Sequence, residues 1–95
     1  MRTVIAETKI SKEQLGLVKP FYEEVAAYTR KQPGCIFYGV YRETENPTSI
    51  VFIERWASEE ALEAHLHDPV FLSMYRKIEN CFCEDEIIRT FDLYV

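Results

Sequence analysis

The chain has 95 residues, of which 47% are hydrophobic and 28% are charged, the balance of a small globular protein. We expect residues 1–95 to form one domain, which excludes a multidomain enzyme, a disordered chain and a collagen-like repeat. Sixteen acidic residues against eleven basic ones give a net charge of −5. This acidic balance argues against a nucleic-acid partner and against binding to an anionic membrane surface.

Membrane and export signals are weak in this sequence. No apolar run is longer than the one at Ile50–Ile53, which is far too short to span a membrane, and Arg2 interrupts any signal-peptide core. The three cysteines, Cys35, Cys81 and Cys83, form no Cys-x-x-Cys pair. We therefore expect a cytoplasmic protein with reduced thiols, and a redox role for Cys81 or Cys83 is the alternative.

The first two elements are a strand and a helix. Alternation predicts a strand over Thr3–Ile10. Its inward side chains are Val4, Ala6, Thr8 and Ile10. Ser11, with a glutamine three residues later, matches a capping box, whereas Pro20 is unfavourable inside a helix because it lacks an N–H group. We expect a loose turn over Ser11–Leu17 and the main helix over Val18–Lys31.

The rest of the chain predicts two paired strands, two short helices and a final strand. The strands are expected at Cys35–Glu43, Ser49–Trp56 and Glu86–Tyr94. Ser58 caps a helix over Glu59–Leu66, and Asp68 followed by Pro69 starts another that runs to about Asn80. This β-α-β-β-α-(α)-β order predicts an α+β fold of the ferredoxin-like βαββαβ type, with an antiparallel four-stranded sheet.

The second and third strands are apolar on both faces. Simple alternation puts Ile36, Tyr38 and Val40 on one face, and Cys35, Phe37 and Tyr41 on the other. In the third strand, Ile50 and Phe52 oppose Val51 and Ile53. Helices on one side of a sheet leave its other side bare, so the second apolar face needs a cover. A second copy of the chain, packed sheet against sheet as a homodimer, supplies one.

The two histidines differ in direction. His65 continues the inward stripe of its predicted helix, whereas His67 points about 200° away, so the pair cannot chelate one metal ion. We expect no metal site. His65 is either a core histidine bonded to a backbone carbonyl or a functional group whose pKa suits proton transfer.

Two further side chains share a strand face near His65. Glu54 lies two residues before Trp56, and a carboxylate placed there needs a basic partner or a shifted pKa. Trp56 is either a core anchor or one wall of a site. Together with Phe71 and Tyr75 from the last predicted helix, its ring could enclose a flat aromatic molecule.

Two segments carry a family resemblance. Pro33-Gly34-Cys35-Ile36-Phe37-Tyr38 matches a P-G-C-x-x-Y pattern, and Glu54 to His65 matches E-x-W-x-[S/D]-x-x-A-x-x-x-H. In these motifs the chain resembles the antibiotic biosynthesis monooxygenase family, over nearly its whole length.

The resemblance implies a fold and a reaction and supports His65 as the helix histidine of the family motif, whereas the roles of the other candidate residues follow from their positions near it. The fold is a dimeric α+β barrel, and the reaction is oxidation of a quinol or polyphenolic aromatic by O₂ without flavin, haem or metal. His65 would be the general base, with Trp56 and Glu54 catalytic beside it. Phe71 and Tyr75 would bind the substrate.

Other activities on the same scaffold stay open at this point. One is isomerisation of a small ketone, and another is a non-catalytic ligand-binding or stress-response module. The haem-degrading relatives use a histidine on the helix that here reads Val70–Tyr75. Tyr75 stands in its place, which disfavours haem.

Overall fold

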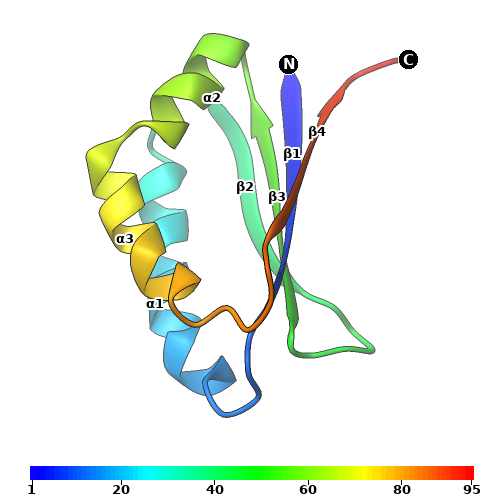
Figure 1. Ribbon diagram of the computed structural model, residues 1–95. Coiled ribbons are helices and arrows are strands. Elements are labelled where there is room, and N and C mark those ends of the chain that lie inside the picture. Colours follow the sequence, from blue (N-terminus) through cyan, green and yellow to red (C-terminus); the bar gives the residue numbers. More distant parts are fainter.

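Four antiparallel strands form one sheet, and three helices lie against one of its faces in the computed structural model, which describes residues 1–95 (Figure 1). The elements are β1 (Arg2–Lys9), α1 (Leu15–Thr29), β2 (Cys35–Arg42), β3 (Ser49–Trp56), α2 (Glu59–Leu66), α3 (Pro69–Glu79) and β4 (Ile87–Asp92). The strand order across the sheet is β2-β3-β1-β4. The predicted ferredoxin-like α+β fold is therefore confirmed. None of the three helices is long and apolar enough to cross a membrane.

The start of α1 differs from the prediction. The helix begins at Leu15, Ser11 is not its cap, and no side chain bonds to its first N–H groups. Pro20 lies inside the helix. The ring removes the hydrogen bond to the carbonyl of Gly16, four residues earlier, but both residues are exposed, so water can satisfy that carbonyl. Exposure therefore allows a proline that a buried helix would not tolerate.

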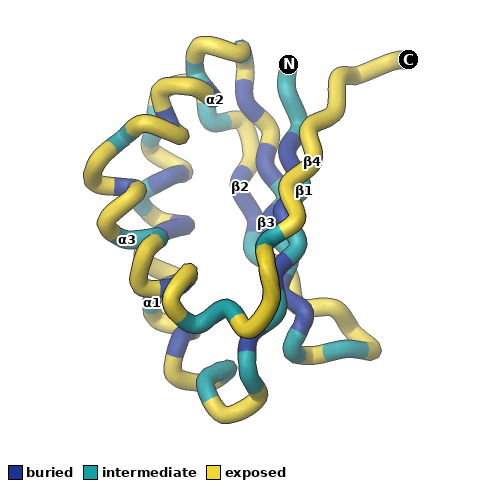
Figure 2. Tube along the Cα trace, in the orientation of Figure 1, coloured by how far each residue is buried: buried dark blue, intermediate teal, exposed yellow.

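The core lies between the sheet and the helices, where Figure 2 shows the buried residues of both layers facing each other. The inward residues predicted for β1 are all buried: Val4, Ala6, Thr8 and Ile10. From β3 the buried side chains are Ser49, Ile50, Phe52, Glu54 and Trp56. Most of these are apolar, so the acid Glu54 stands out within a hydrophobic layer.

A β-bulge at the start of β2 corrects one predicted face. Cys35 pairs with Trp56 and Phe37 pairs with Arg55, which leaves Ile36 as the extra residue. Cys35 therefore packs against the core instead of sharing the face of Phe37, and Ile36 is 52% exposed instead of facing inward. Beyond the bulge the alternation holds as predicted.

Gly34 sets the distance between the start of β2 and α2. Its backbone has a φ of 81°, and a Cβ atom built there would lie 2.4 Å from the Cβ of Ala61 on α2. The Gly34 carbonyl also accepts a hydrogen bond from Ala57 N at 2.8 Å. Only glycine combines this backbone conformation with this close approach.

We expect Gly34→Ala to lower the free energy of unfolding by about 2 kcal/mol or more, because the new methyl group forces α2 away from the sheet. Gly16→Ala is the matched control. Its Cβ would meet no atom within 4 Å, so this helix substitution should raise stability by about 0.5–1 kcal/mol. Urea unfolding followed by circular dichroism measures both, and equal stability of the two variants would contradict the assigned role of Gly34.

Candidate active site

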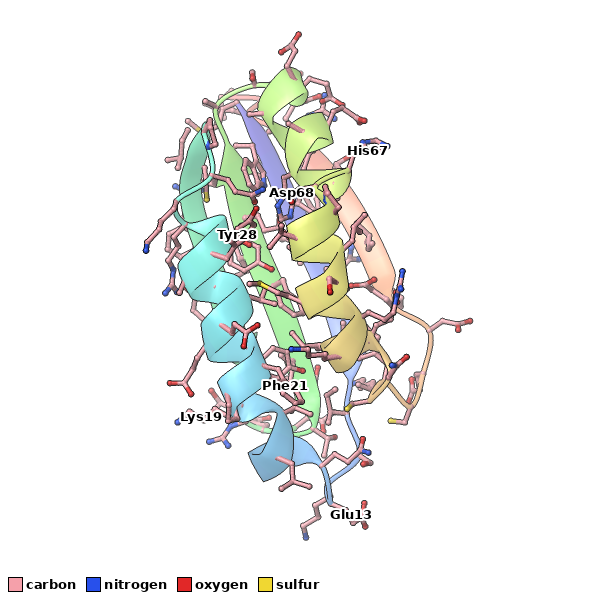
Figure 3. The ribbon with its side chains drawn as sticks, turned by 90° about the vertical axis from the view of Figure 1, so that its left-hand side faces the viewer. Glu13, Lys19, Phe21, Tyr28, His67 and Asp68 are labelled. Carbon is pink, nitrogen blue, oxygen red and sulfur yellow. The ribbon has the colours of Figure 1, made fainter.

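The local sequence of α2 places His65 inside the protein. Ser58 caps the helix, with its Oγ accepting a hydrogen bond from Ala61 N at 3.1 Å. This start puts His65 on the inner face, where it is 1% exposed. The side chain of His67 is 78% exposed and projects outward from the corner between α2 and α3 (Figure 3). The opposite directions predicted for the two histidines are confirmed.

Aromatic rings enclose His65. Its imidazole stacks on Trp56 at a centroid distance of 4.5 Å and lies 3.9 Å from the ring of Phe71. Phe71 in turn stacks on Tyr75 at 5.4 Å, and Tyr38 meets His65 edge-on at 6.1 Å. The structure thus brings the predicted aromatic residues together with His65 from three elements, β3, α2 and α3.

The rings touch one another instead of lining an open cleft. The three main surface pockets have no contribution from Trp56, Phe71 or Tyr75, and His65 lines one of them, on its Gln32 side. None of these three pockets is the open aromatic pocket predicted from the sequence. A flat ligand would reach His65 only after some of these rings separate.

Glu54 is buried directly beside His65. Its Oε1 accepts a hydrogen bond from Trp56 Nε1 at 2.9 Å and lies 3.7 Å from His65 Nε2. No lysine or arginine pairs with it, so the basic partner considered in the sequence analysis is absent. Burial raises the pKa of the Glu54 carboxyl to about 7, and the Trp56 hydrogen bond only partly opposes this rise.

Burial acts on His65 in the opposite direction. It lowers the pKa of the imidazole to about 4, since the charged form loses hydration and the negative charge of Asp68 offsets only a part of that loss. Near neutral pH the imidazole is therefore uncharged, and a large share of Glu54 carries a proton. Although His65 and Glu54 lie within ion-pair distance of each other, both groups are therefore largely neutral.

The other nitrogen of His65 has a partner that the sequence analysis did not identify. Nδ1 lies 2.6 Å from Gln32 Oε1, a side-chain carbonyl and not a backbone one. Gln32 follows α1 in the connection to β2, where no periodicity assigns a direction to its side chain. Only the tertiary structure reveals this contact.

Glu86 is a second acid that the sequence analysis missed. Tyr75 donates its hydroxyl hydrogen bond to Glu86 Oε2. Burial raises the pKa of Glu86, and the charge of Glu86 contributes to the raised pKa of Glu54. Alternation could have indicated its direction, because Glu86 has the parity of Ile88, which pairs with the inward Ala6. Glu54 and Glu86 are thus two carboxyl groups on the helix-facing side of the sheet.

The structure contains no group of three or more histidine, cysteine, aspartate or glutamate side chains positioned to hold a metal ion. All three cysteines are free thiols.

The sequence pattern of the family described as Antibiotic biosynthesis monooxygenase matches residues 1–77. The chain belongs to this family. A solved structure described as an antibiotic biosynthesis monooxygenase is 29% identical, with a TM-score of 0.93 and full coverage of both chains.

Two other relatives extend the comparison. An uncharacterized protein of Synechocystis is 27% identical over 81 residues, which cover 85% of this chain and 52% of that protein. The chain thus spans about half the length of this curated relative. The structure of SnoaB, a cofactor-independent oxygenase from Streptomyces nogalater, has a TM-score of 0.87 at 19% identity. The match covers 99% of this chain and 93% of the SnoaB chain. At 19% identity it shows only that the two proteins share a fold.

The opposite pKa shifts of Glu54 and His65 predict a specific pH dependence of stability. Between its ordinary pKa of 4.5 and about 7, Glu54 keeps its proton in the folded state and loses it in the unfolded state, so the free energy of unfolding falls as pH rises. His65 has the opposite effect between about 4 and its ordinary 6.5, so stability rises with pH. In the native protein the two contributions largely cancel.

Glu54→Gln should expose the histidine contribution. We expect the stability of this variant, relative to the native protein, to increase by up to about 3 kcal/mol from pH 4.5 to pH 7. Chemical denaturation at a series of pH values measures the difference. Parallel curves for the two proteins would show that Glu54 titrates normally in the folded state.

Proposed function

We propose that the protein oxidises a quinol or polyphenolic aromatic with O₂, without a cofactor, and that His65 is the general base. The observation that carries this proposal is a buried imidazole that stacks on Trp56, packs against the tilted ring of Phe71 and lies 3.7 Å from Glu54. Membership of a family of monooxygenases supports the reaction class.

The chemistry needs a base in a dry, aromatic environment. His65 takes the proton of a substrate hydroxyl, and the resulting anion is electron-rich enough to pass an electron to O₂. One oxygen atom then enters the ring, and the other leaves as water with two substrate hydrogens, so that a phenol becomes a quinone. Once ionised, Glu54 stabilises the imidazolium formed at His65.

Stacking accounts for the preference for a flat substrate. Trp56 and Phe71 already hold one planar group, the imidazole, between them, and Tyr75 continues the same stack. An aromatic ligand that enters between these rings replaces the ring–ring contacts of Phe71 and Tyr75 with equivalent ones. The site is thus one that opens as it binds.

Oxygen uptake with a menadiol-type quinol tests the proposal. We expect His65→Ala to lower kcat by ~10²-fold or more, the usual effect of losing a general base. His67→Ala is the matched control on the same helix end, and it should keep full activity because its side chain is in solvent. Circular dichroism checks that both variants fold. Equal activity of the two would remove His65 from the mechanism, and quinol binding without oxygen uptake by the native protein would indicate a non-catalytic ligand-binding module.

We also propose that two copies associate through the outer face of the sheet to form a dimeric α+β barrel. The registers place these apolar side chains on that face: Ile5, Phe37, Tyr41, Val51, Ile53, Ile87 and Phe91. Four of them, Phe37, Tyr41, Ile87 and Phe91, are 39% to 54% exposed. An exposed apolar face of this extent is characteristic of an interface, and a second copy offers a matching one.

Light scattering at micromolar concentration should therefore give the mass of two chains, with more than ~1,000 Å² buried between them. Ile53→Glu places a charge at the centre of the proposed interface and should yield monomers. Leu17→Glu, on the exposed side of α1, is the control and should leave the dimer intact. A native protein with the mass of one chain would contradict the dimer.

A further inference from the structure

A line of three hydrogen bonds ends at His65. The Tyr28 hydroxyl donates to Asp68 Oδ2 at 2.6 Å, the Gln32 amide Nε2 donates to the same oxygen at 2.8 Å, and Gln32 Oε1 lies 2.6 Å from His65 Nδ1. Figure 3 shows Tyr28 on α1 and Asp68 at the start of α3 on facing sides of the junction between these helices. The line thus joins the end of α1 and the loop after it to the corner between α2 and α3.

The donors and acceptors in this line determine which group donates in each of the three hydrogen bonds. An ionised carboxylate only accepts hydrogen bonds, and Asp68 is held in that form because the hydrogen bond from Tyr28 lowers its pKa. Gln32 must then turn its NH₂ group toward Asp68 and its carbonyl toward His65. A carbonyl also only accepts, so the hydrogen in the 2.6 Å contact belongs to His65 Nδ1.

A neutral imidazole carries one N–H, so this assignment leaves Nε2 with a free lone pair. Nε2 is the nitrogen 3.7 Å from Glu54, on the interior side, whereas Nδ1 faces the surface pocket of about 670 Å³ that Tyr28, Gln32 and Asp68 help to line. The two nitrogens thus face different surroundings.

We propose that Gln32, oriented by Asp68, is a positioning residue that fixes His65 in the Nδ1–H tautomer and so makes Nε2 the basic atom of the site. The tautomer follows from the hydrogen bonds alone. Its catalytic consequence rests on the proposed function, because only a base at Nε2 faces the aromatic interior.

The same geometry limits where the proton goes. A glutamine amide donates and accepts hydrogen bonds without passing on a proton, so the line from Tyr28 to His65 orients the ring and does not conduct protons. A proton taken up at Nε2 must also leave from Nε2. Glu54, with its oxygen 3.7 Å away, is the titratable group positioned to receive it.

Nitrogen-15 NMR of the histidine side chains in the full chain tests the tautomer directly. We expect His65 in the native protein to show a protonated Nδ1 and an unprotonated Nε2. Gln32→Leu removes the acceptor, so the Nε2–H form should appear, donating to Glu54. Gln32→Glu keeps an acceptor toward His65, and the neighbouring carboxylate of Asp68 favours the protonated form of the new side chain, which can still donate to Asp68, so this variant should keep the native tautomer. His67, on the other side of the helix end, is the internal reference in every spectrum.

Kinetics with the menadiol-type quinol supply the second readout. We expect Gln32→Leu to lower kcat by ~10-fold or more with little change in KM, and Gln32→Glu to recover most of that loss. Lys31→Leu, a neighbouring substitution that lines the same pocket, is the control and should change neither the spectrum nor kcat.

A protonated Nε2 in the native protein, or an unchanged tautomer in Gln32→Leu, would overturn the proposal. Because the native spectrum needs no variant, the assignment is testable even where a variant fails to fold. If the native protein shows the expected tautomer but takes up no oxygen, the positioning of His65 by Gln32 stands and the proposed oxidation is overturned.

Discussion

Desolvation of one histidine and one glutamate is the constraint on which the rest of this structure depends. Removing His65 and Glu54 from water disfavours the charged form of each, and burial reverses the order of their pKa values, which become about 4 for His65 and about 7 for Glu54. A fold that only needed stability would place apolar residues at both positions. The chain instead surrounds the pair with rings, bonds Trp56 Nε1 to Glu54 Oε1 and places Gln32 Oε1 against His65 Nδ1.

Asp68 links the architecture to this polar pair. Its Oδ1 accepts hydrogen bonds from the N–H groups of Val70 and Phe71 and so starts α3, while its Oδ2 holds Tyr28 and Gln32. One carboxylate thus fixes the beginning of a helix and the orientation of an amide that reaches His65. The ring of Phe71, in the first turn of that helix, packs on the same imidazole. The position of α3 and the direction of the His65 nitrogens are consequently set together.

The sequence sufficed for features that follow from local periodicity and capping. The bounds of β3 and α2 were predicted as found, and so was the inward direction of His65, because alternation and helical spacing act over a few residues. The bulge at Ile36 broke the alternation in β2 without a local signal. Gln32 escaped prediction for a related reason: it lies between regular elements, and its direction depends on a carboxylate 36 positions along the chain. Long-range polar pairing was therefore the part of the site that periodicity could not supply.

Strand β3 connects the candidate site to the outer face of the sheet. Phe52, Glu54 and Trp56 point toward the helices, and Val51, Ile53 and Arg55 point away from them. Because successive side chains alternate, a shift of one residue in register would move Glu54 to the outer face and put Ile53 or Arg55 in its place beside His65. The bulge confines the irregularity to the start of β2, and beyond it Tyr38 pairs with Glu54 in unbroken register. Correct pairing of β2 with β3 therefore keeps Glu54 buried and the apolar side chains on the outer face. The proposed chemistry relies on the first of these placements, and the proposed dimer relies on the second.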